Sequence, residues 1–358
     1  MPTAVFRMND WASGTSRNFP LVIYACDFSI WKKPIVRRFF AGSRVIFVRS
    51  ASRVPADSAL LVWGRKIIPG KLAAGVQLIQ LEDGFLRSVG LGADLIPPVS
   101  WVIDTRGIYY DATQPSDLEV LLQTTDFTPD LLARTVRLRE RIVSNGLTKY
   151  NVGSNLWQRP VGAERVILVP GQVESDASLR FGAPGICTNL GLLRAVREAN
   201  PNAYLLYKPH PDVVAGLRRK GQGEGEANHW CDEVVADVVM GELLQQVDEV
   251  HTLTSLAGFE ALLRGKAVTC YGQPFYAGWG LTMDIEPILR RSRRLSLDML
   301  VAGALILYPT YISRLTGRCT TAECTLDELL AWRTAETSGL PWWNTAYRFV
   351  VGRILRRP

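Results

Sequence analysis

Short apolar runs alternate with stretches of helical pattern along most of this chain, and this alternation constrains the fold more than any other feature. Strand-like runs cover residues 21–26, 44–48, 60–63, 76–81, 101–104, 165–169, 203–207, 248–253 and 267–271. Helical patterns cover residues 30–40, 117–123, 129–145, 189–199 and 256–264. Ser116 and Glu119 form a capping-box pattern at the start of the second, and Thr128-Pro129 opens the third. Such alternation predicts parallel sheets covered by helices, that is, an α/β fold.

The length of the chain predicts more than one domain. Its 358 residues exceed one average core, and the polar stretch 148–160 has the composition of a linker. We expect an N-terminal domain over residues 1–147, a C-terminal domain over 148–300 and a C-terminal helical segment over 301–358. No signal peptide is expected, because the first twenty residues lack an apolar core, and no run is long enough to span a bilayer.

Composition excludes a disordered chain and favours an anionic partner. Hydrophobic residues make up 47% of the chain, and the net charge is +7. Positive charge suits a nucleotide, a nucleic acid or a membrane surface without choosing among them. The six cysteines are scattered without a C-x-x-C pair, which indicates reduced thiols in the cytoplasm and no zinc site. No metal and no cofactor is expected.

Three polar motifs stand where predicted strands end: Glu82-Asp83-Gly84, Lys208-Pro209-His210-Pro211 and Thr254-Ser255. In open α/β sheets, ligands bind outside the carboxyl ends of strands. Prolines on both sides hold the histidine on a stiff, extended backbone. The motifs together suggest a two-domain enzyme that acts on a nucleotide-activated sugar.

The acidic residues have both a catalytic and a structural interpretation. Glu82 and Asp83 repel each other, so one of them is expected to hold a proton and act in acid–base chemistry. Alternatively, they are capping acids at a strand-end turn. Asp176 and Ser178 follow Gln172 in a strand-to-helix loop, where a carboxylate can attack an anomeric carbon. Alternatively, they cap the helix.

The other two motifs suit a phosphate. Lys208 and His210 together match a departing phosphate group, although a lone histidine is often structural. Thr254 and Ser255 open a helix whose amides are accessible beside the small Gly258, although an ordinary N-cap has the same pattern.

Two aromatic segments also have alternatives. Tyr276 and Trp279 lie in the glycine-rich loop 272–280, where aromatic rings either stack on a base or sugar or pack between domains. Residues 342–357 combine tryptophan, tyrosine and arginine. This tail suits a membrane interface or a helix that packs on the body of the protein.

Taken together, the motifs resemble those of bacterial CMP-sialic acid transferases, and more closely those of capsule polysaccharide β-Kdo transferases of the KpsC type. The matching segments are 81–88 (Leu-Glu-Asp-Gly-Phe-Leu-Arg-Ser), 107–113 (Gly-Ile-Tyr-Tyr-Asp-Ala-Thr), 172–178 (Gln-Val-Glu-Ser-Asp-Ala-Ser), 208–212 (Lys-Pro-His-Pro-Asp) and 274–282 (Pro-Phe-Tyr-Ala-Gly-Trp-Gly-Leu-Thr). They span about residues 60–335. Proteins of this type usually carry two such modules, and this chain has one.

The resemblance implies a GT-B-like fold of two Rossmann-like domains facing an interdomain cleft. It implies a retaining transferase that uses CMP-β-Kdo and extends a Kdo-terminated lyso-phosphatidylglycerol acceptor at the cytoplasmic face of the inner membrane, with no nucleic acid as partner. Asp176 is the implied nucleophile, and Glu82, beside Asp83, the acid/base. The implied CMP-binding residues are Gln172, Ser178, Lys208, His210, Thr254, Ser255 and Gly258.

Physical reasoning gives the same roles. The anomeric carbon of Kdo bears a carboxylate and no hydrogen, so its transition state is a strongly cationic oxocarbenium ion, and retention needs a nucleophilic carboxylate and an acid/base. Arg87 and Lys208 are candidates to bind the Kdo carboxylate, and Tyr276 and Trp279 to contact substrate. The rival hypotheses are a nucleotide-sugar epimerase or hydrolase of the same architecture and a non-catalytic capsule assembly or export factor.

Overall fold

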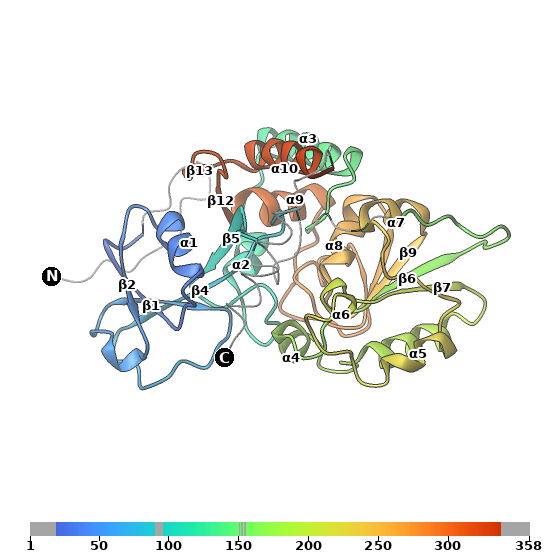
Figure 1. Ribbon diagram of the computed structural model, residues 1–358, viewed down its shortest axis with the longest axis horizontal. Helices are drawn as coiled ribbons and strands as arrows, with labels where there is room; N and C mark the ends of the chain where they lie inside the picture. The colour runs from blue at the N-terminus through green and yellow to red at the C-terminus, as the bar shows by residue number, and fades with distance from the viewer. Residues whose placement is uncertain (1–18, 90–95, 150, 152, 154, 338–358) are drawn as a thin grey trace. The chain divides into compact units, whose positions relative to one another are not determined.

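The computed structural model describes residues 19–89, 96–149, 151, 153 and 155–337 (Figure 1). Within it the chain forms two compact units. Unit 1 contains the described residues up to Arg106 and those from Leu305 onward, and unit 2 is Gly107–Ala304. The expected boundary at residue 147 therefore differs from the observed division. Residues 107–147 group with unit 2, and the polar stretch 148–160 lies inside that unit rather than between the two.

Among the described residues, unit 1 holds a seven-stranded mixed sheet with the order β13-β12-β5-β4-β3-β1-β2. Its strands are β1 (Val22–Cys26), β2 (Arg44–Val48), β3 (Ala59–Trp63), β4 (Gln77–Asp83), β5 (Ser100–Asp104), β12 (Pro309–Ile312) and β13 (Cys319–Thr320). Strands β2, β1, β3 and β4 run parallel, and the pairings β4–β5, β5–β12 and β12–β13 are antiparallel. The expectation of a separate helical segment after residue 300 was wrong, because β12 and β13 complete this sheet.

The sheet of unit 1 has a core on each face because its strand residues alternate in direction. On one face, α1 (Lys32–Phe39) buries Ile35, Val36 and Phe39, and the ring of Phe39 stacks on Trp101 at a centroid distance of 4.3 Å. On the other face, η1 (Ala51–Arg53) covers a smaller cluster around Leu60. Helix α10 (Ala322–Thr337) lies against β12.

Unit 2 is built on an all-parallel sheet with the order β8-β7-β6-β9-β10-β11. Its strands are β6 (Val166–Pro170), β7 (Tyr204–Lys208), β8 (Glu233–Val234), β9 (Glu249–Thr252), β10 (Ala267–Cys270) and β11 (Met283–Asp284). Numbered along the chain, this order is 3-2-1-4-5-6, the order of the Rossmann fold. The near-continuous apolar strands match a sheet that is covered on both faces.

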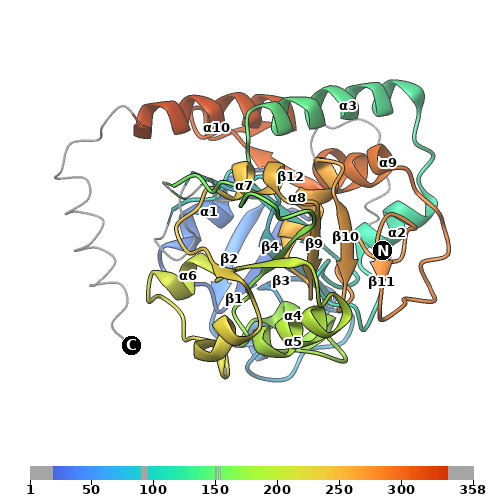
Figure 2. The same cartoon turned by 90° about the vertical axis from the view of Figure 1, so that its right-hand side faces the viewer.

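Helices cover both faces of this parallel sheet (Figures 1 and 2). Helices α4 (Ala177–Gly182) and α5 (Asn189–Ala199) lie on one face, and α7 (Met240–Gln246) and α8 (Leu256–Leu263) on the other. The short α6 (Pro211–Val214) and η3 (Glu224–His229) lie in the connection that follows β7. The predicted range of α5 agrees with the structure at both ends.

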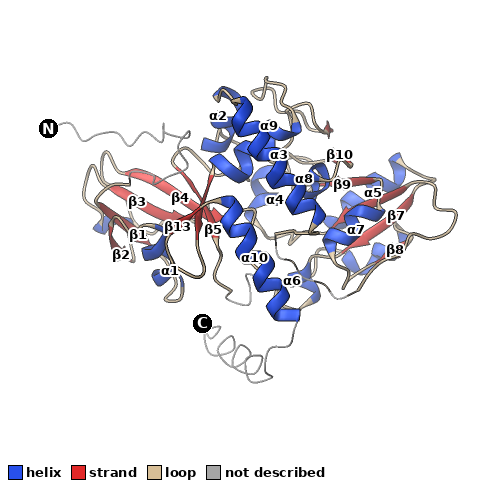
Figure 3. Ribbon diagram, turned by 90° about the horizontal axis from the view of Figure 1, so that it is seen from above, coloured by secondary structure: helices blue, strands red, loops and turns tan. Residues whose placement is uncertain are grey.

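Three further helices belong to unit 2: α2 (Asp117–Thr124), α3 (Pro129–Ser144) and α9 (Leu297–Val301). Each begins at a hydroxyl N-cap, as the sequence predicted for the first two. Helix α9 contacts α3 and α8 (Figure 3). Arg139 of α3 pairs with Asp298 of α9 at 2.9 Å. The π-helical segment η4 (Ala302–Leu307) then carries the chain from unit 2 back to unit 1.

Candidate functional site

The strand order of unit 2 places its predicted motifs at one edge of the sheet. From β6 the chain proceeds to β7 and β8 on one side, and β9 pairs with the other side of β6. Ligands of doubly wound sheets bind outside the carboxyl ends of the strands at such a switch point. The loops after β6, β7 and β9 carry Asp176, His210 and Ser255. The candidate site is therefore the carboxyl edge of the parallel sheet around β6 and β9.

The side chain of Gln172 joins the two loops at the switch point. Its Nε2 donates to Thr254 Oγ1, and its Oε1 accepts from the Thr254 amide, each at 2.9 Å. The backbone of Gln172 exchanges two further hydrogen bonds with the side chain of Asn189, at 2.8 and 2.9 Å. These bonds use both ends of the Gln172 amide. In the structure, Gln172 and Thr254 thus fix the shape of the site.

Ser255 begins α8 as the sequence predicted. Its Oγ accepts a hydrogen bond from the Ala257 amide, and its own amide donates to Thr252 Oγ1, each at 3.2 Å. The space beside Gly258 is filled by Tyr276, whose hydroxyl oxygen would lie 2.3 Å from a Cβ at that position. The same hydroxyl donates to the Ser255 carbonyl. Because Gly258 has no side chain, the Tyr276 ring fits beside it, and the Tyr276 hydroxyl holds the start of α8 in place.

His210 lies at the end of β7, where it is the N-cap of α6. Its Nδ1 accepts a hydrogen bond from the Asp212 amide at 3.2 Å, so the neutral ring carries its proton on Nε2. Burial lowers the pKa of His210 to about 4, although the Asp176 carboxylate opposes this shift. The sequence interpretation matched Lys208 and His210 to a departing phosphate group. The structure offers a neutral N–H donor at physiological pH.

Lys208 supplies positive charge from within the protein. The side chain is 7% exposed, and Nζ donates to the Ala236 carbonyl at 3.0 Å. Burial lowers the pKa of Lys208 to about 8, against the opposing charge of Asp237. The Lys208 carbonyl accepts from the amide of Gly171, which ties the ends of β7 and β6 together. The cation therefore lies behind the loops.

Asp176 precedes α4, but its carboxylate accepts no capping hydrogen bond from that helix. The side chain is 42% exposed, and one oxygen lies 3.5 Å from Arg218 Nη2. Partial burial raises the pKa of Asp176, and Arg218 and His210 oppose the shift. The capping alternative thus does not account for this carboxylate. Ser178 lies in the first turn of α4 and is partly buried.

Tyr276 and Trp279 are fully buried, with 0% of each side chain exposed. Trp279 Nε1 donates to the Phe275 carbonyl at 2.8 Å, within the same loop. Rings without exposed surface cannot stack on a sugar in this conformation. The expectation that they contact substrate is therefore corrected in favour of the packing alternative, and both rings pack inside unit 2.

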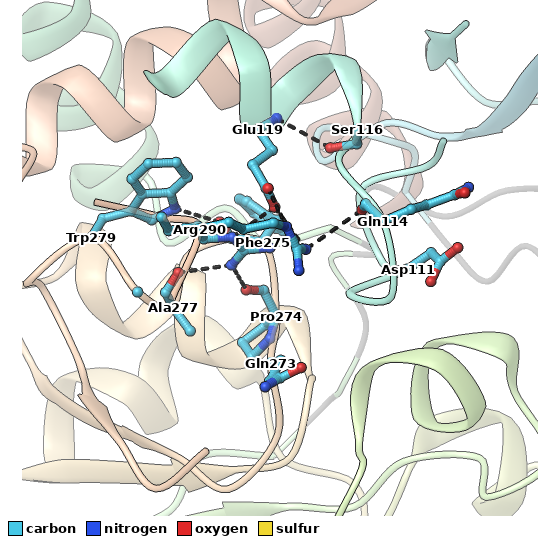
Figure 4. A network of polar contacts seen from close by, with 12 residues as sticks. Asp111, Gln114, Ser116, Glu119, Gln273, Pro274, Phe275, Ala277, Trp279 and Arg290 are labelled. Carbon is cyan, nitrogen blue, oxygen red and sulfur yellow. Dashed lines mark hydrogen bonds and ion pairs between the residues drawn. The ribbon is translucent and has the colours of Figure 1, made fainter. Parts of the chain in front are cut away.

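A buried ion-pair network behind this loop was missed by the sequence analysis (Figure 4). Glu119 was expected to complete a capping box with Ser116, and the Ser116 hydroxyl does accept from the Glu119 amide at 3.1 Å. The Glu119 carboxylate, however, binds Arg290 and Arg291, with bonds of 2.5 and 2.8 Å from the two Nε atoms. Arg291 also donates to the carbonyls of Pro274 and Ala277, so the network holds the aromatic loop. The only signal for this network in the sequence was the arginine cluster at residues 290–294.

In unit 1, Glu82 and Asp83 are the last residues of β4. Arg87 Nε donates to Asp83 Oδ2 at 2.6 Å, and Glu82 Oε1 accepts from the Asp83 amide at 3.1 Å. The Arg87 guanidinium is 2% exposed and also donates to Ser88 and to the Ile96 carbonyl. The assignment of Arg87 to a substrate carboxylate is therefore corrected: this guanidinium is engaged inside the protein and anchors Asp83.

No group of three or more histidine, cysteine or acidic side chains arranged to hold a metal ion occurs among the residues that the structure describes. Within the same residues, no helix is both long and apolar enough to cross a bilayer. The aromatic and basic tail 342–357 lies outside the described residues.

Comparisons with known proteins place this chain in a family. A model of capsule polysaccharide biosynthesis proteins matches residues 59–154 and 158–318. The chain belongs to that family. It is 46% identical over 318 residues to the capsule polysaccharide modification protein LipA of Neisseria meningitidis, and 42% identical over 298 residues to the lipopolysaccharide-processing protein LpsZ of Rhizobium meliloti. These matches cover 86% and 78% of this chain, and 45% and 68% of the relatives, so the chain spans about half the length of LipA.

Two solved structures of Thermosulfurimonas dismutans KpsC share the fold. The one described as a beta Kdo 2,7 transferase is 43% identical with a TM-score of 0.73, and the alignment covers 87% of this chain and 99% of that one. The one described as a beta Kdo 2,4 transferase is 33% identical with a TM-score of 0.77, covering 87% and 98%. The two Rossmann-like units are therefore those of a KpsC-like, GT-B-like fold.

Proposed function

We propose that this chain is a retaining glycosyltransferase that transfers Kdo from CMP-β-Kdo to a Kdo-terminated acceptor in capsule biosynthesis. The observation that carries the proposal is the set of Asp176, His210 and the start of α8 at the switch point of a Rossmann-like sheet, in a chain 43% identical to a Kdo transferase of known structure. Each residue has chemistry that matches one part of the donor.

The phosphate of the donor suits the α8 edge of the site. The dipole of a helix favours negative charge at its N-terminus, and Ser255 begins α8. His210 adds a neutral Nε2–H donor, and Lys208 adds positive charge from behind the loops. A neutral histidine also forms no ion pair with Asp176, whose carboxylate lies 3.5 Å from Arg218 Nη2. Departing CMP is thus stabilised without neutralising the nucleophile.

The transfer itself proceeds by two displacements. An Asp176 carboxylate oxygen bonds to the anomeric carbon of Kdo while the bond from that carbon to the phosphate oxygen breaks, and CMP leaves with the electron pair. The acceptor hydroxyl oxygen then bonds to the same carbon, its proton passes to Glu82, and the Asp176 carboxylate is released. Asp83, fixed by Arg87, supports Glu82 as the base. No step requires a metal ion.

The acceptor is proposed to be a lyso-phosphatidylglycerol lipid that ends in Kdo, joined by either a 2,4 or a 2,7 linkage. The tail 342–357 is proposed to hold the protein at the cytoplasmic surface of the inner membrane through its aromatic and basic residues. Truncation after residue 338 should abolish salt-sensitive binding to anionic liposomes and spare transfer to a soluble acceptor. Equal liposome binding by the truncated chain, or loss of folding, contradicts this role for the tail.

The deciding experiment supplies CMP-Kdo, generated in situ, and a synthetic soluble acceptor that ends in β-Kdo. Mass spectrometry should detect an acceptor that is longer by one Kdo, and NMR of that product should show a β configuration and identify the linkage. Release of free Kdo at the same rate with and without acceptor favours the hydrolase alternative. No consumption of CMP-Kdo, with the acceptor still bound, favours the non-catalytic alternative.

A further inference from the structure

The sheet of unit 1 has a switch point of its own. Strand β1 lies between β2 and β3, and the chain proceeds from β1 to β2 before it returns to β3 on the other side. Because β1, β3 and β4 are parallel, their carboxyl ends share one edge. That edge is where a ligand of such a sheet binds. Glu82 and Asp83 end β4 there, so the residues that follow β1 and end β3 are their neighbours.

A lysine and a tryptophan occupy those two positions. Lys32 is the first residue of α1, which follows β1, and Trp63 is the last residue of β3. The Lys32 Nζ lies 3.0 Å from the centre of the Trp63 ring. The Trp63 ring in turn meets Trp101 edge-on at 5.4 Å. The core therefore fixes the indole, and the indole fixes the ammonium by a cation–π contact.

The Lys32 ammonium has hydrogen-bonding capacity left over. An ammonium carries three N–H donors, and none of the residues that the structure describes accepts a hydrogen bond from this one. Burial lowers the pKa of Lys32 to about 8, and Asp83 and Glu82 oppose that shift by their negative charge. A partly buried cation without an acceptor is costly to maintain unless a ligand supplies one.

The neighbouring cations are engaged elsewhere. Arg87 binds Asp83, Ser88 and the Ile96 carbonyl, and Lys66 pairs with Asp27 at 3.2 Å. Lys32 is thus the cation of this edge whose donors point to no protein acceptor within the described residues. An ammonium held on an aromatic ring beside a carboxylate pair matches a sugar acid: the sugar carboxylate binds the ammonium, and a sugar hydroxyl meets the carboxylate pair.

We propose that Lys32 and Trp63 form the binding site for the terminal sugar acid of the acceptor, with the Lys32 ammonium bound to its carboxylate. This inference rests on the proposed function, because it assigns Glu82 to the hydroxyl of that same sugar. It identifies the acceptor by its negative charge and places the recognition in unit 1, apart from the residues that bind CMP.

The test compares two soluble ligands, a glycoside that ends in β-Kdo and its carboxylate methyl ester. Lys32→Gln should raise the KM and the calorimetric Kd for the acid about 10-fold or more, as expected for the loss of a hydrogen bond between charged groups. The KM and the Kd for the ester should stay within about twofold of the wild-type values. Trp63→Phe should weaken binding of the acid by a smaller factor, because a ring face remains under the ammonium.

Lys33→Gln is the matched control, because Lys33 is the next residue of α1 and its Nζ lies 5.3 Å from the Phe47 ring. Lys33→Gln should leave the KM and the Kd of both ligands unchanged. Equal losses for acid and ester in Lys32→Gln would overturn the proposal, since they indicate a structural or charge-balancing role, and so would unchanged binding of the acid. Lys32→Met, which keeps the apolar stem of the side chain, repeats the test if Lys32→Gln has a lowered Tm.

The experiments distinguish failure of the proposed function from failure of the Lys32 site. If the wild-type chain neither transfers nor hydrolyses CMP-Kdo, the assignment as a transferase falls. The calorimetric comparison of acid with ester still decides whether a sugar acid binds at Lys32. A wild-type protein that uses CMP-Kdo but does not prefer the acid to the ester refutes the Lys32 site alone.

Discussion

The two switch points of this chain are built on the same principle and carry different side chains. In unit 2, the Gln172 amide bonds both loops, His210 is a neutral donor, and Lys208 is 7% exposed behind the loops. In unit 1, Lys32 lies on an aromatic ring next to two carboxylates. Preorganised neutral donors suit a phosphate that must depart, whereas an ammonium beside a carboxylate pair suits an anionic sugar whose hydroxyl must lose a proton.

The largest expected effect tests the nucleophile of unit 2. Asp176→Asn keeps the size of the side chain and removes its nucleophilicity, so transfer should fall about 1,000-fold or more while the Kd for CMP stays within a few-fold. Glu198→Gln, an exposed carboxylate of α5, is the control and should retain wild-type kinetics. Near-normal transfer by Asp176→Asn would remove Asp176 from the mechanism.

Substitutions of Glu82 and Asp83 in unit 1 should lower kcat by unequal factors. Glu82→Gln should lower kcat about 100-fold or more, and intact mass spectrometry should find protein that carries one Kdo, because the second displacement lacks its base. Asp83→Asn should have a smaller effect through the loss of its charge-assisted bond to Arg87. A larger loss of kcat in Asp83→Asn reverses the two roles.

His210 is expected to act through binding. His210→Ala removes one donor to a charged phosphate, so the Kd for CMP should rise about 10-fold. Because burial lowers its pKa to about 4, the imidazole resonances of His210 should not titrate between pH 8 and pH 5. Titration of His210 near pH 6.5, or an unchanged Kd in the variant, shows that it is not a neutral phosphate ligand.

Lys208 should make CMP binding depend on pH in the alkaline range. Its pKa of about 8 in the folded protein lies below the usual 10.5, so the positive charge is present at neutral pH and is lost as the pH rises through about 8. The Kd for CMP should therefore rise between pH 7 and pH 9, by calorimetry. Lys208→Met should bind CMP more weakly at pH 7 and lose this dependence. If the Kd for CMP of Lys208→Met depends on pH as the wild-type Kd does, a group other than Lys208 causes the dependence.

The smallest effect tests the support of α8. Tyr276→Phe removes the hydroxyl that donates to the Ser255 carbonyl, at a cost of about 1 kcal/mol, so the Kd for CMP should rise a few-fold. Tyr271→Phe, at the residue that follows β10, is the matched control. If both variants bind CMP as the wild type does, the hydroxyl of Tyr276 serves packing alone.

Local patterns in the sequence predicted most elements correctly. The predicted ranges for β2 and α5 agree with the structure, and Ser116, Thr128 and Ser255 cap helices as expected. These features depend on neighbours within a few residues, which periodicity and capping chemistry describe. The polar motifs were correctly placed at strand ends for the same reason.

Long-range contacts decided what the sequence left open. The sequence by itself determined the alternation of strands and helices, the family motifs and therefore an α/β chain with its polar residues at strand ends. Only the tertiary structure decided that residues 309–320 complete the first sheet, that Tyr276 and Trp279 are buried, that Arg87 is engaged by Asp83, and that Lys32 lies on Trp63. The physical reason is that burial and ion pairing join residues far apart in the chain, as Glu119 and Arg291 are, and no local pattern specifies which partners meet.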